Sequence, residues 1–290
     1  MTETFFKYLQ FEKRLSRNTL SAYRNDIVQF ATFLSTSFEE SDPGRATYPM
    51  IRSWIISLTE EGIQPVSINR KIATLRAFYK FLMIQGSITV DPSFKITVLK
   101  TSKRLPSFIR EQEVDAMFSA PFPDDFEGTR DRLILELFYG TGMRLSELLG
   151  LTDSAFNLAD RNVKVLGKRS KERVIPFGKS LVAMIQEYLA RRREIIETNE
   201  GPFFVTSSGE SCYPMMVYRI VKRHMLSTTS ERKSPHILRH TYATHLLDRG
   251  AEISAVKDLL GHSSLAATQV YTHNSIDKIK RVFNQAHPKA

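Results

Sequence analysis

The stretch GHSSLAATQVYTH, residues 261–273, holds one tyrosine and two histidines among small uncharged residues. Tyr271 could be a core aromatic on a short helix, or its hydroxyl could act as a nucleophile. A free phenol has a pKa of about 10, so it needs cationic neighbours before it ionises near neutral pH. The role of Tyr271 therefore depends on which cations and bases the rest of the chain brings beside it.

Two arginines stand at positions that suit an anion. In GTGMRLSEL, glycines precede Arg144 at the expected start of a helix, where backbone N–H groups and a guanidinium both favour phosphate. In HILRHTYATH, Arg239 lies three residues after His236 and shares a helix face with it. The alternatives are a surface ion pair between Arg144 and Glu147, and a helix-end His236 buried in the core.

A basic turn, GKRSKER, separates two segments of alternating apolar residues and predicts a β-hairpin. Lys168, Arg169, Lys171 and Arg173 either keep an exposed tip soluble or enter a nucleic-acid groove. A lysine held close to a phosphate can also donate a proton to a leaving oxygen if its pKa is lowered.

These residues, with His262, supply an anion clamp, acids, bases and an oxygen nucleophile. A zinc site at His236 and His240 is the weaker interpretation, because no glutamate follows the first histidine and no third ligand is evident. The sequence also lacks a phosphate-binding G-x-x-x-x-G-K-[ST] loop and a carboxylate cluster for a two-metal mechanism. We therefore expect phosphodiester transfer to a protein hydroxyl with no cofactor and no metal.

Helical periodicity dominates the first third of the chain. Apolar residues recur at steps of three and four, and predict three helices within an all-helical domain over residues 1–98. The apolar stripe of the third helix is Ile68, Ile72, Leu75, Phe78 and Leu82. Its other face carries Arg70, Lys71, Arg76 and Lys80, and is expected to be solvated, with phosphate contact as the minority alternative.

The remainder mixes helices with the hairpin. We expect a polar linker over 99–107 and a catalytic domain over 108–290, with helices before Gly142, over 180–197, from Pro235 to about Gly250, and up to Gly261. The fold class is therefore mainly α with a small β-hairpin or sheet.

Composition points to a polyanionic partner. The net charge is +10, and the first 104 residues carry 15 Lys and Arg against 9 Asp and Glu. This excess favours nucleic acid as the partner, with an anionic membrane surface second and a merely basic enzyme as the remaining alternative. One cysteine, no signal-peptide layout and no apolar run of about 20 residues predict a cytoplasmic protein that does not span a membrane.

The motifs GTGMRLSEL, LGKRSKERVIP, HILRHTYATHLL and LLGHSSLAATQVYTH, in this order and spacing, resemble those of the tyrosine recombinase (phage integrase) family, most closely its Xer-type branch. The resemblance covers nearly the whole chain. It implies an N-terminal SAM-like core-binding domain and a mixed catalytic domain. Arg169 stands where many relatives have glycine, and Tyr242 where phenylalanine is common.

The resemblance also implies roles for single residues. Arg144 and Arg239 would clamp the scissile phosphate, and Glu147 would support them. Tyr271 would attack to give a 3′-phosphotyrosyl link. Three further roles are implied. Lys168 would protonate the 5′ leaving oxygen, His236 would serve as an acid or base near the attacking tyrosine, and His262 would donate a hydrogen bond to a non-bridging phosphate oxygen.

Assembly follows from the same resemblance. It implies a homo- or hetero-tetramer on a specific DNA site, with the segment SIDKIKRVFNQAHPKA docking on a neighbouring protomer. The alternative is that this segment, with Ile279, Val282 and Phe283, packs on its own domain. A second recombinase and a DNA translocase are further expected partners in chromosome dimer resolution.

Other functions are compatible with the same residues. An integrase or invertase of a mobile element would share the chemistry. A type IB topoisomerase-like enzyme, and a DNA-binding protein without catalysis, are the remaining alternatives. All six catalytic positions hold their expected residues, which disfavours the last.

Overall fold

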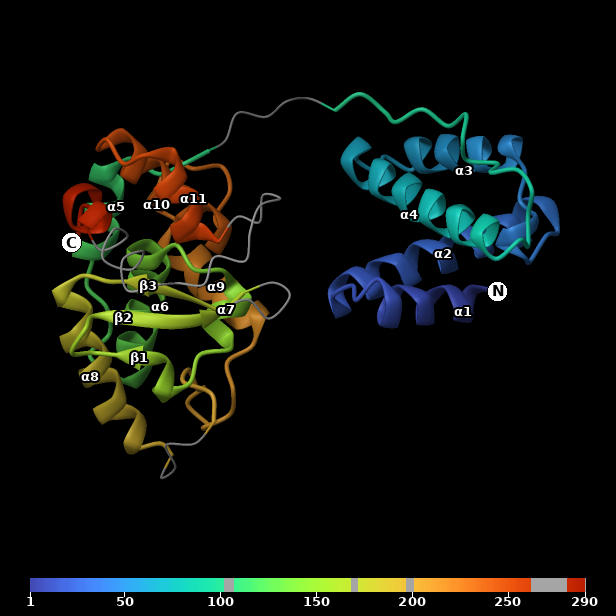
Figure 1. The fold of residues 1–290 in the computed structure, drawn as a ribbon. Helices are drawn as coiled ribbons and strands as arrows, with labels where there is room; N and C mark the ends of the chain where they lie inside the picture. Colours follow the sequence, from blue (N-terminus) through green and yellow to red (C-terminus); the bar gives the residue numbers. More distant parts are fainter. Residues whose placement is uncertain (102–106, 168–171, 197–200, 262–280, 290) are drawn as a thin grey trace. The chain divides into compact units, whose positions relative to one another are not determined.

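The computed structural model describes residues 1–101, 107–167, 172–196, 201–261 and 281–289. The chain divides into two compact units, Met1–Arg104 and Leu105–Ala290, each drawn in Figure 1. Among the described residues, no helix is both long and apolar enough to cross a bilayer.

The first unit is built from helices packed around one apolar core. Its elements are α1 (Thr2–Lys7), a π-helical turn (Tyr8–Glu12), α2 (Arg17–Phe38), a 3₁₀ turn (Pro43–Arg45), α3 (Tyr48–Glu60) and α4 (Pro65–Ile84). The Ser16 hydroxyl caps α2 by accepting a hydrogen bond from the Thr19 N–H. The whole apolar stripe expected on the third helix is buried in α4, so the periodicity of the sequence identified the core face correctly.

One expectation for α4 is wrong. Lys71 was expected on a solvated face, but it is only 7% exposed. Its ammonium lies 3.1 Å from the carboxylate of Asp26 on α2, and that carboxylate also pairs with Arg70. A charged side chain can be buried when it is paired in this way, and the partner lies too far along the chain for helical periodicity to reveal it.

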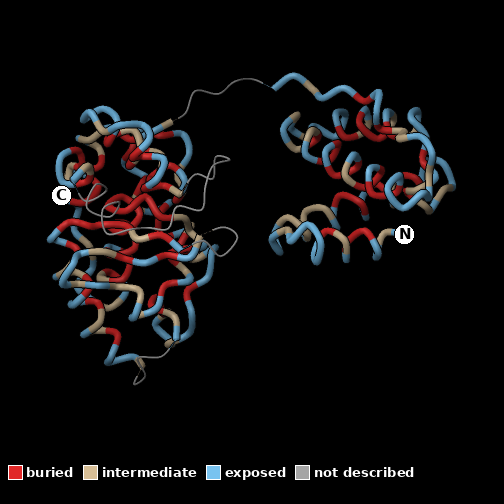
Figure 2. The backbone as a smooth tube through the Cα atoms, in the orientation of Figure 1, coloured by how far each residue is buried: buried red, intermediate tan, exposed pale blue. Residues whose placement is uncertain are grey.

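The second unit combines helices with a small sheet. Its elements are α5 (Glu111–Ser119), α6 (Phe126–Thr141), α7 (Leu145–Leu149), a 3₁₀ turn (Asp153–Ala155), β1 (Phe156–Asn157), β2 (Asn162–Leu166), β3 (Glu172–Pro176), α8 (Lys179–Arg193), α9 (Pro214–His224), α10 (Pro235–Asp248) and α11 (Ile253–Leu260). The strands form an antiparallel sheet in the order β1-β2-β3. The buried segments drawn in red in Figure 2 run through both the sheet and the helices of this unit. The expected fold class, mainly α with a small sheet, is confirmed.

The hairpin fixes which side chains point inward. Val163 and Val165 of β2 are buried, and the register pairs Val163 with Ile175 and Val165 with Arg173. Because strand side chains alternate between faces, Arg173 is directed to the same buried face as these valines. The sequence placed Arg173 in an exposed basic turn, and that interpretation is wrong, since the residue is 4% exposed.

The described C-terminal residues, 281–289, pack within the same unit. Phe283 and His287 are buried, and Lys289 lies 2.7 Å from both carboxylate oxygens of Glu136 on α6. These residues therefore pack on their own domain in the single chain. Ile279 and the rest of the expected docking segment, residues 275–280, lie outside the described residues.

Candidate functional site

The first element of the site is the turn between α6 and α7. Gly142 ends α6 in the left-handed conformation, with φ of 60°. A Cβ at this position would lie 2.5 Å from the Tyr242 ring, so the backbone can approach that ring only with glycine. The turn places Arg144 at the N-cap of α7, as the sequence predicted.

Arg144 is bound to Glu147 within one helical turn. The Arg144 backbone N–H donates to the carboxylate at 2.7 Å, and its Nη1 donates to the other oxygen at 2.8 Å. The Glu147 side chain is fully buried, whereas 29% of the Arg144 side chain is exposed. The pair was considered as a surface ion pair from sequence, but its carboxylate lies in the interior.

A second arginine, on strand β3 of the sheet, binds the same carboxylate. Arg173 of β3 donates from Nη1 and Nη2 to the two oxygens of Glu147, at 2.5 and 2.8 Å. Burial alone would raise the pKa of Glu147, but the hydrogen bonds and charge of Arg173, together with those of Arg144, outweigh it and hold the pKa at about 2. Glu147 is therefore ionised at neutral pH.

Arg239 enters from α10 and is 8% exposed. Its Nη1 donates to the carbonyl oxygen of Gly142, and its Nη2 donates to the carbonyl oxygen of Leu260 at 2.5 Å. Burial, followed by the charges of Arg144 and Arg173, lowers its pKa to about 10. The guanidinium still carries its charge at neutral pH.

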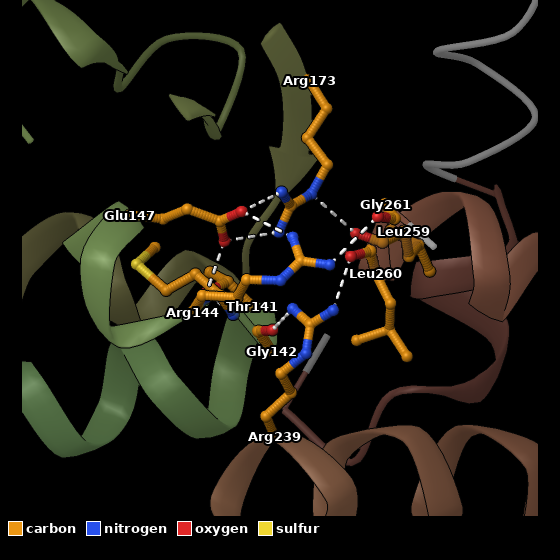
Figure 3. A network of polar contacts seen from close by, with 10 residues as sticks. Thr141, Gly142, Arg144, Glu147, Arg173, Arg239, Leu259, Leu260 and Gly261 are labelled. Carbon is orange, nitrogen blue, oxygen red and sulfur yellow. Dashed lines mark hydrogen bonds and ion pairs between the residues drawn. The ribbon is translucent and has the colours of Figure 1, made fainter. Parts of the chain in front are cut away.

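The three guanidinium groups meet at the C-terminal end of α11. Figure 3 shows them converging on three consecutive carbonyl oxygens, which accept one arginine each: Leu259 from Arg173 Nε at 3.1 Å, Leu260 from Arg239 Nη2 at 2.5 Å, and Gly261 from Arg144 Nη2 at 3.0 Å. The last carbonyls of a helix lack partners within the helix and form its negative end. The arginines supply those partners, and they fix Gly261 beside the cluster.

The cluster has an excess of positive charge. Among the described residues that form it, three arginines face one carboxylate. Guanidinium groups bind phosphate with well-oriented, charge-assisted hydrogen bonds. The arrangement can therefore bind an anion at the partly exposed side of Arg144.

The remaining expected site residues are placed only in part. His236 is the second residue of α10, one turn before Arg239, and it is exposed, so the alternative of a core histidine is wrong. Lys168, His262 and Tyr271 lie outside the described residues, although His262 directly follows Gly261 in the chain. The structure thus brings Arg144 and Arg239 together at the end of α11, and Glu147 binds the first of them.

The sequence did not single out Arg173 as part of the site. The signal available was its spacing: it lies two residues before Ile175 on a strand whose alternate residues are apolar. That period of two indicates an inward side chain, and an inward arginine needs a carboxylate or carbonyl partner.

Two known sequence families match this chain. The phage integrase family matches residues 107–277, and the N-terminal SAM-like domain of phage integrases matches residues 2–86. A tyrosine recombinase XerC from Chlorobaculum parvum is 37% identical over 316 residues, which cover 99% of this chain and 94% of that protein. A XerD from Chlorobaculum tepidum is 37% identical over 296 residues, which cover 99% and 96%.

Solved structures agree on the fold. A XerH site-specific recombinase bound to palindromic difH substrate superposes with a TM-score of 0.72 at 19% identity, covering 97% of this chain and 83% of that one. The Tn1549 transposon integrase in complex with transposon right-end DNA gives 0.70 at 19% identity, covering 96% and 98%.

The chain therefore belongs to the phage integrase family of tyrosine recombinases. Within that family it is a site-specific recombinase of the Xer type, the group that includes the XerC and XerD relatives.

Proposed function

We propose that the arginine cluster binds the scissile phosphate of a DNA strand, and that Tyr271 attacks it. The observation that carries the proposal is the convergence of Arg144 and Arg239, with Glu147 holding the first of them (Figure 3). A guanidinium has five N–H donors, and the contacts described above engage two of them from Arg239. Donors therefore remain for the non-bridging oxygens of a phosphate, whose charge grows in the transition state.

The proposed reaction exchanges one phosphodiester for another. The Tyr271 oxygen forms a bond to phosphorus, and the bond to the 5′ oxygen breaks. Lys168 gives that oxygen its proton, His236 takes the proton of the tyrosine, and His262 donates to a non-bridging oxygen. Attack by the 5′-hydroxyl of a partner strand reverses the step, so the bond energy is conserved and the reaction consumes neither ATP nor a metal ion.

The proposed substrate is a double-stranded recombination site. The basic composition and the charge of the first 104 residues support contact with many phosphates. We assign residues 1–98 to core binding, 99–107 to a linker and 108–290 to catalysis in the cytoplasm, with two protomers on each of two sites.

Chromosome dimer resolution is the biological role we favour. The named relatives are XerC and XerD proteins, and a pair of such recombinases would act with a DNA translocase. Integration or inversion of a mobile element uses the same chemistry, but the curated relatives do not favour it.

The test is covalent capture on DNA. A duplex pool with a random core and a nick that traps the cleaved strand is incubated with the full chain. The wild type is expected to form protein–DNA adducts, and Tyr271→Phe is expected to lose them while it retains salt-dependent DNA binding. Adducts formed by the phenylalanine variant would show that the nucleophile is another residue.

The acid role of Lys168 has a separate test. Lys168→Ala should slow cleavage of ordinary DNA but spare a substrate whose 5′ leaving group needs no proton, such as a 5′-bridging phosphorothiolate. Equal loss on both substrates would assign Lys168 to binding instead.

A further inference from the structure

Arg173 occupies a central position in the arginine cluster. All three of its side-chain nitrogens donate to described acceptors: Nη1 and Nη2 to Glu147, and Nε to the carbonyl oxygen of Leu259. The side chain is 4% exposed. Each side-chain nitrogen of Arg173 therefore donates a hydrogen bond within the protein, and the side chain is buried, whereas the Arg144 side chain is partly exposed.

Two parts of the site depend on these contacts. Through Glu147, Arg173 acts on Arg144, whose backbone and guanidinium are both bound by that carboxylate. Through Leu259, Arg173 acts on the end of α11. A Cβ at Gly261 would lie 3.1 Å from Arg173 Cδ and 3.3 Å from its Nε, so the backbone there is packed directly on the arginine.

We propose that Arg173 is a positioning residue of the recombinase, which sets the geometry of Arg144 and of the α11 end without touching the DNA phosphate. The inference rests on the proposed function, because it assumes that Arg144 binds the scissile phosphate. Arg173 therefore affects catalysis in addition to forming a buried ion pair with Glu147.

The pH dependence of the cleavage rate, through the protonation of Glu147, distinguishes a positioning role of Arg173 from a purely structural one. The charged groups that face it are Arg144 from its own helix, Arg173 from β3 and Arg239 from α10, while α11 contributes backbone carbonyls. Without Arg173, burial would dominate and the pKa of Glu147 would rise. Protonation would then release Arg144 at pH values where the wild-type carboxylate stays ionised.

The experiment measures single-turnover adduct formation at saturating DNA, from about pH 5 to 8, on a nicked duplex recovered by capture with the wild-type chain. Arg173→Met should slow adduct formation by about 100-fold, the cost of a catalytic group misplaced by about 1 Å. As the pH decreases, the rate of this variant should also fall more steeply than the rate of the wild type. Glu147→Gln in the Arg173→Met background should remove that additional fall, because the titrating group is gone. Arg173→Lys, which keeps the charge, should restore part of the rate.

Arg192→Met is the matched control. Arg192 on α8 is equally buried and binds the Asp153 carboxylate with two nitrogens, at 2.8 and 2.6 Å, away from the cluster. Circular dichroism and DNA affinity report whether each variant is folded. An equal loss of rate in both methionine variants, with an unchanged pH profile, would overturn the proposal. Failure of the wild type to form any adduct would instead overturn the proposed function.

Discussion

Replacing Glu147 by glutamine tests the electrostatic basis of the site. Its carboxylate accepts four hydrogen bonds from two arginines and is fully buried. Removing one partner of a buried ion pair costs about 3–5 kcal/mol. Independently, a pKa held at about 2 instead of 4.5 corresponds to about 3 kcal/mol at 1.36 kcal/mol per unit. Both estimates predict that Glu147→Gln lowers the free energy of unfolding of the second unit by about 3 kcal/mol at pH 7.

The effect should depend on pH in a defined direction. Because the folded-state pKa of Glu147 is lowered, its stabilisation is complete above the unfolded value of 4.5 and is lost as pH falls towards 2. The difference in unfolding free energy between the wild type and Glu147→Gln should therefore be constant from pH 7 to about 5.5. Below pH 4.5 it should shrink by about 1.4 kcal/mol per pH unit.

Urea unfolding of the full chain can separate the two units. The single tryptophan, Trp54, is buried in the first unit, so its fluorescence midpoint should not move. The circular dichroism transition of the second unit should shift down by about 1–1.5 M, given an m-value of about 2–3 kcal/mol/M. Glu111→Gln, which breaks a half-exposed pair with Arg249, is the control and should cost less than about 1 kcal/mol. Equal midpoints for Glu147→Gln and Glu111→Gln would show that the buried carboxylate stabilises the second unit no more than an exposed one.

Three further predictions concern other parts of the chain. Asp26→Asn leaves the buried Lys71 without its carboxylate, and should lower the Trp54 fluorescence midpoint by an amount equivalent to about 3 kcal/mol; an unchanged midpoint contradicts this. Gly261→Ala adds a Cβ at φ +61° against Arg173, and should slow adduct formation while DNA affinity is retained. Burial lowers the pKa of His287 to about 4, so its stabilisation is lost as pH falls from 6.5 towards 4; the amide protection factors of residues 281–289, which correct for the pH dependence of intrinsic exchange, should fall in that range, but not in His287→Phe.

Local patterns were sufficient for much of the fold. The period of apolar residues located α4 and its buried face, and the alternation in β2 and β3 identified the hairpin. Gly142 and Gly261 marked helix ends, because both adopt a positive φ that favours glycine. These features depend on residues close in sequence, so a single chain reveals them.

The errors concern partners distant in sequence. Lys71 was assigned to solvent because Asp26, 45 residues earlier, is invisible to helical periodicity. Arg173 was assigned to an exposed turn because its partners, Glu147 and Leu259, lie 26 and 86 residues away. Both charged side chains are buried because the fold places a carboxylate beside them, and only the structure shows which carboxylate that is.

The candidate site was predicted in outline. Arg144 and Arg239 were selected as an anion clamp from helix position and residue type, and the structure places both at the end of α11. The carbonyl groups that orient them could not be predicted, because every residue has a backbone carbonyl and the residue type does not show which of them accept hydrogen bonds.

In the proposed mechanism, Tyr271 becomes covalently linked to the phosphate that Arg144 and Arg239 bind. The most direct measurement is mass spectrometry of proteolysed adducts from the wild-type chain on the nicked duplex pool. We expect a nucleotide joined through its 3′-phosphate to the peptide that contains Tyr271, and loss of that species in Arg144→Ala and Arg239→Ala. A nucleotide attached to any other residue, or an undiminished yield in both arginine variants, would contradict it.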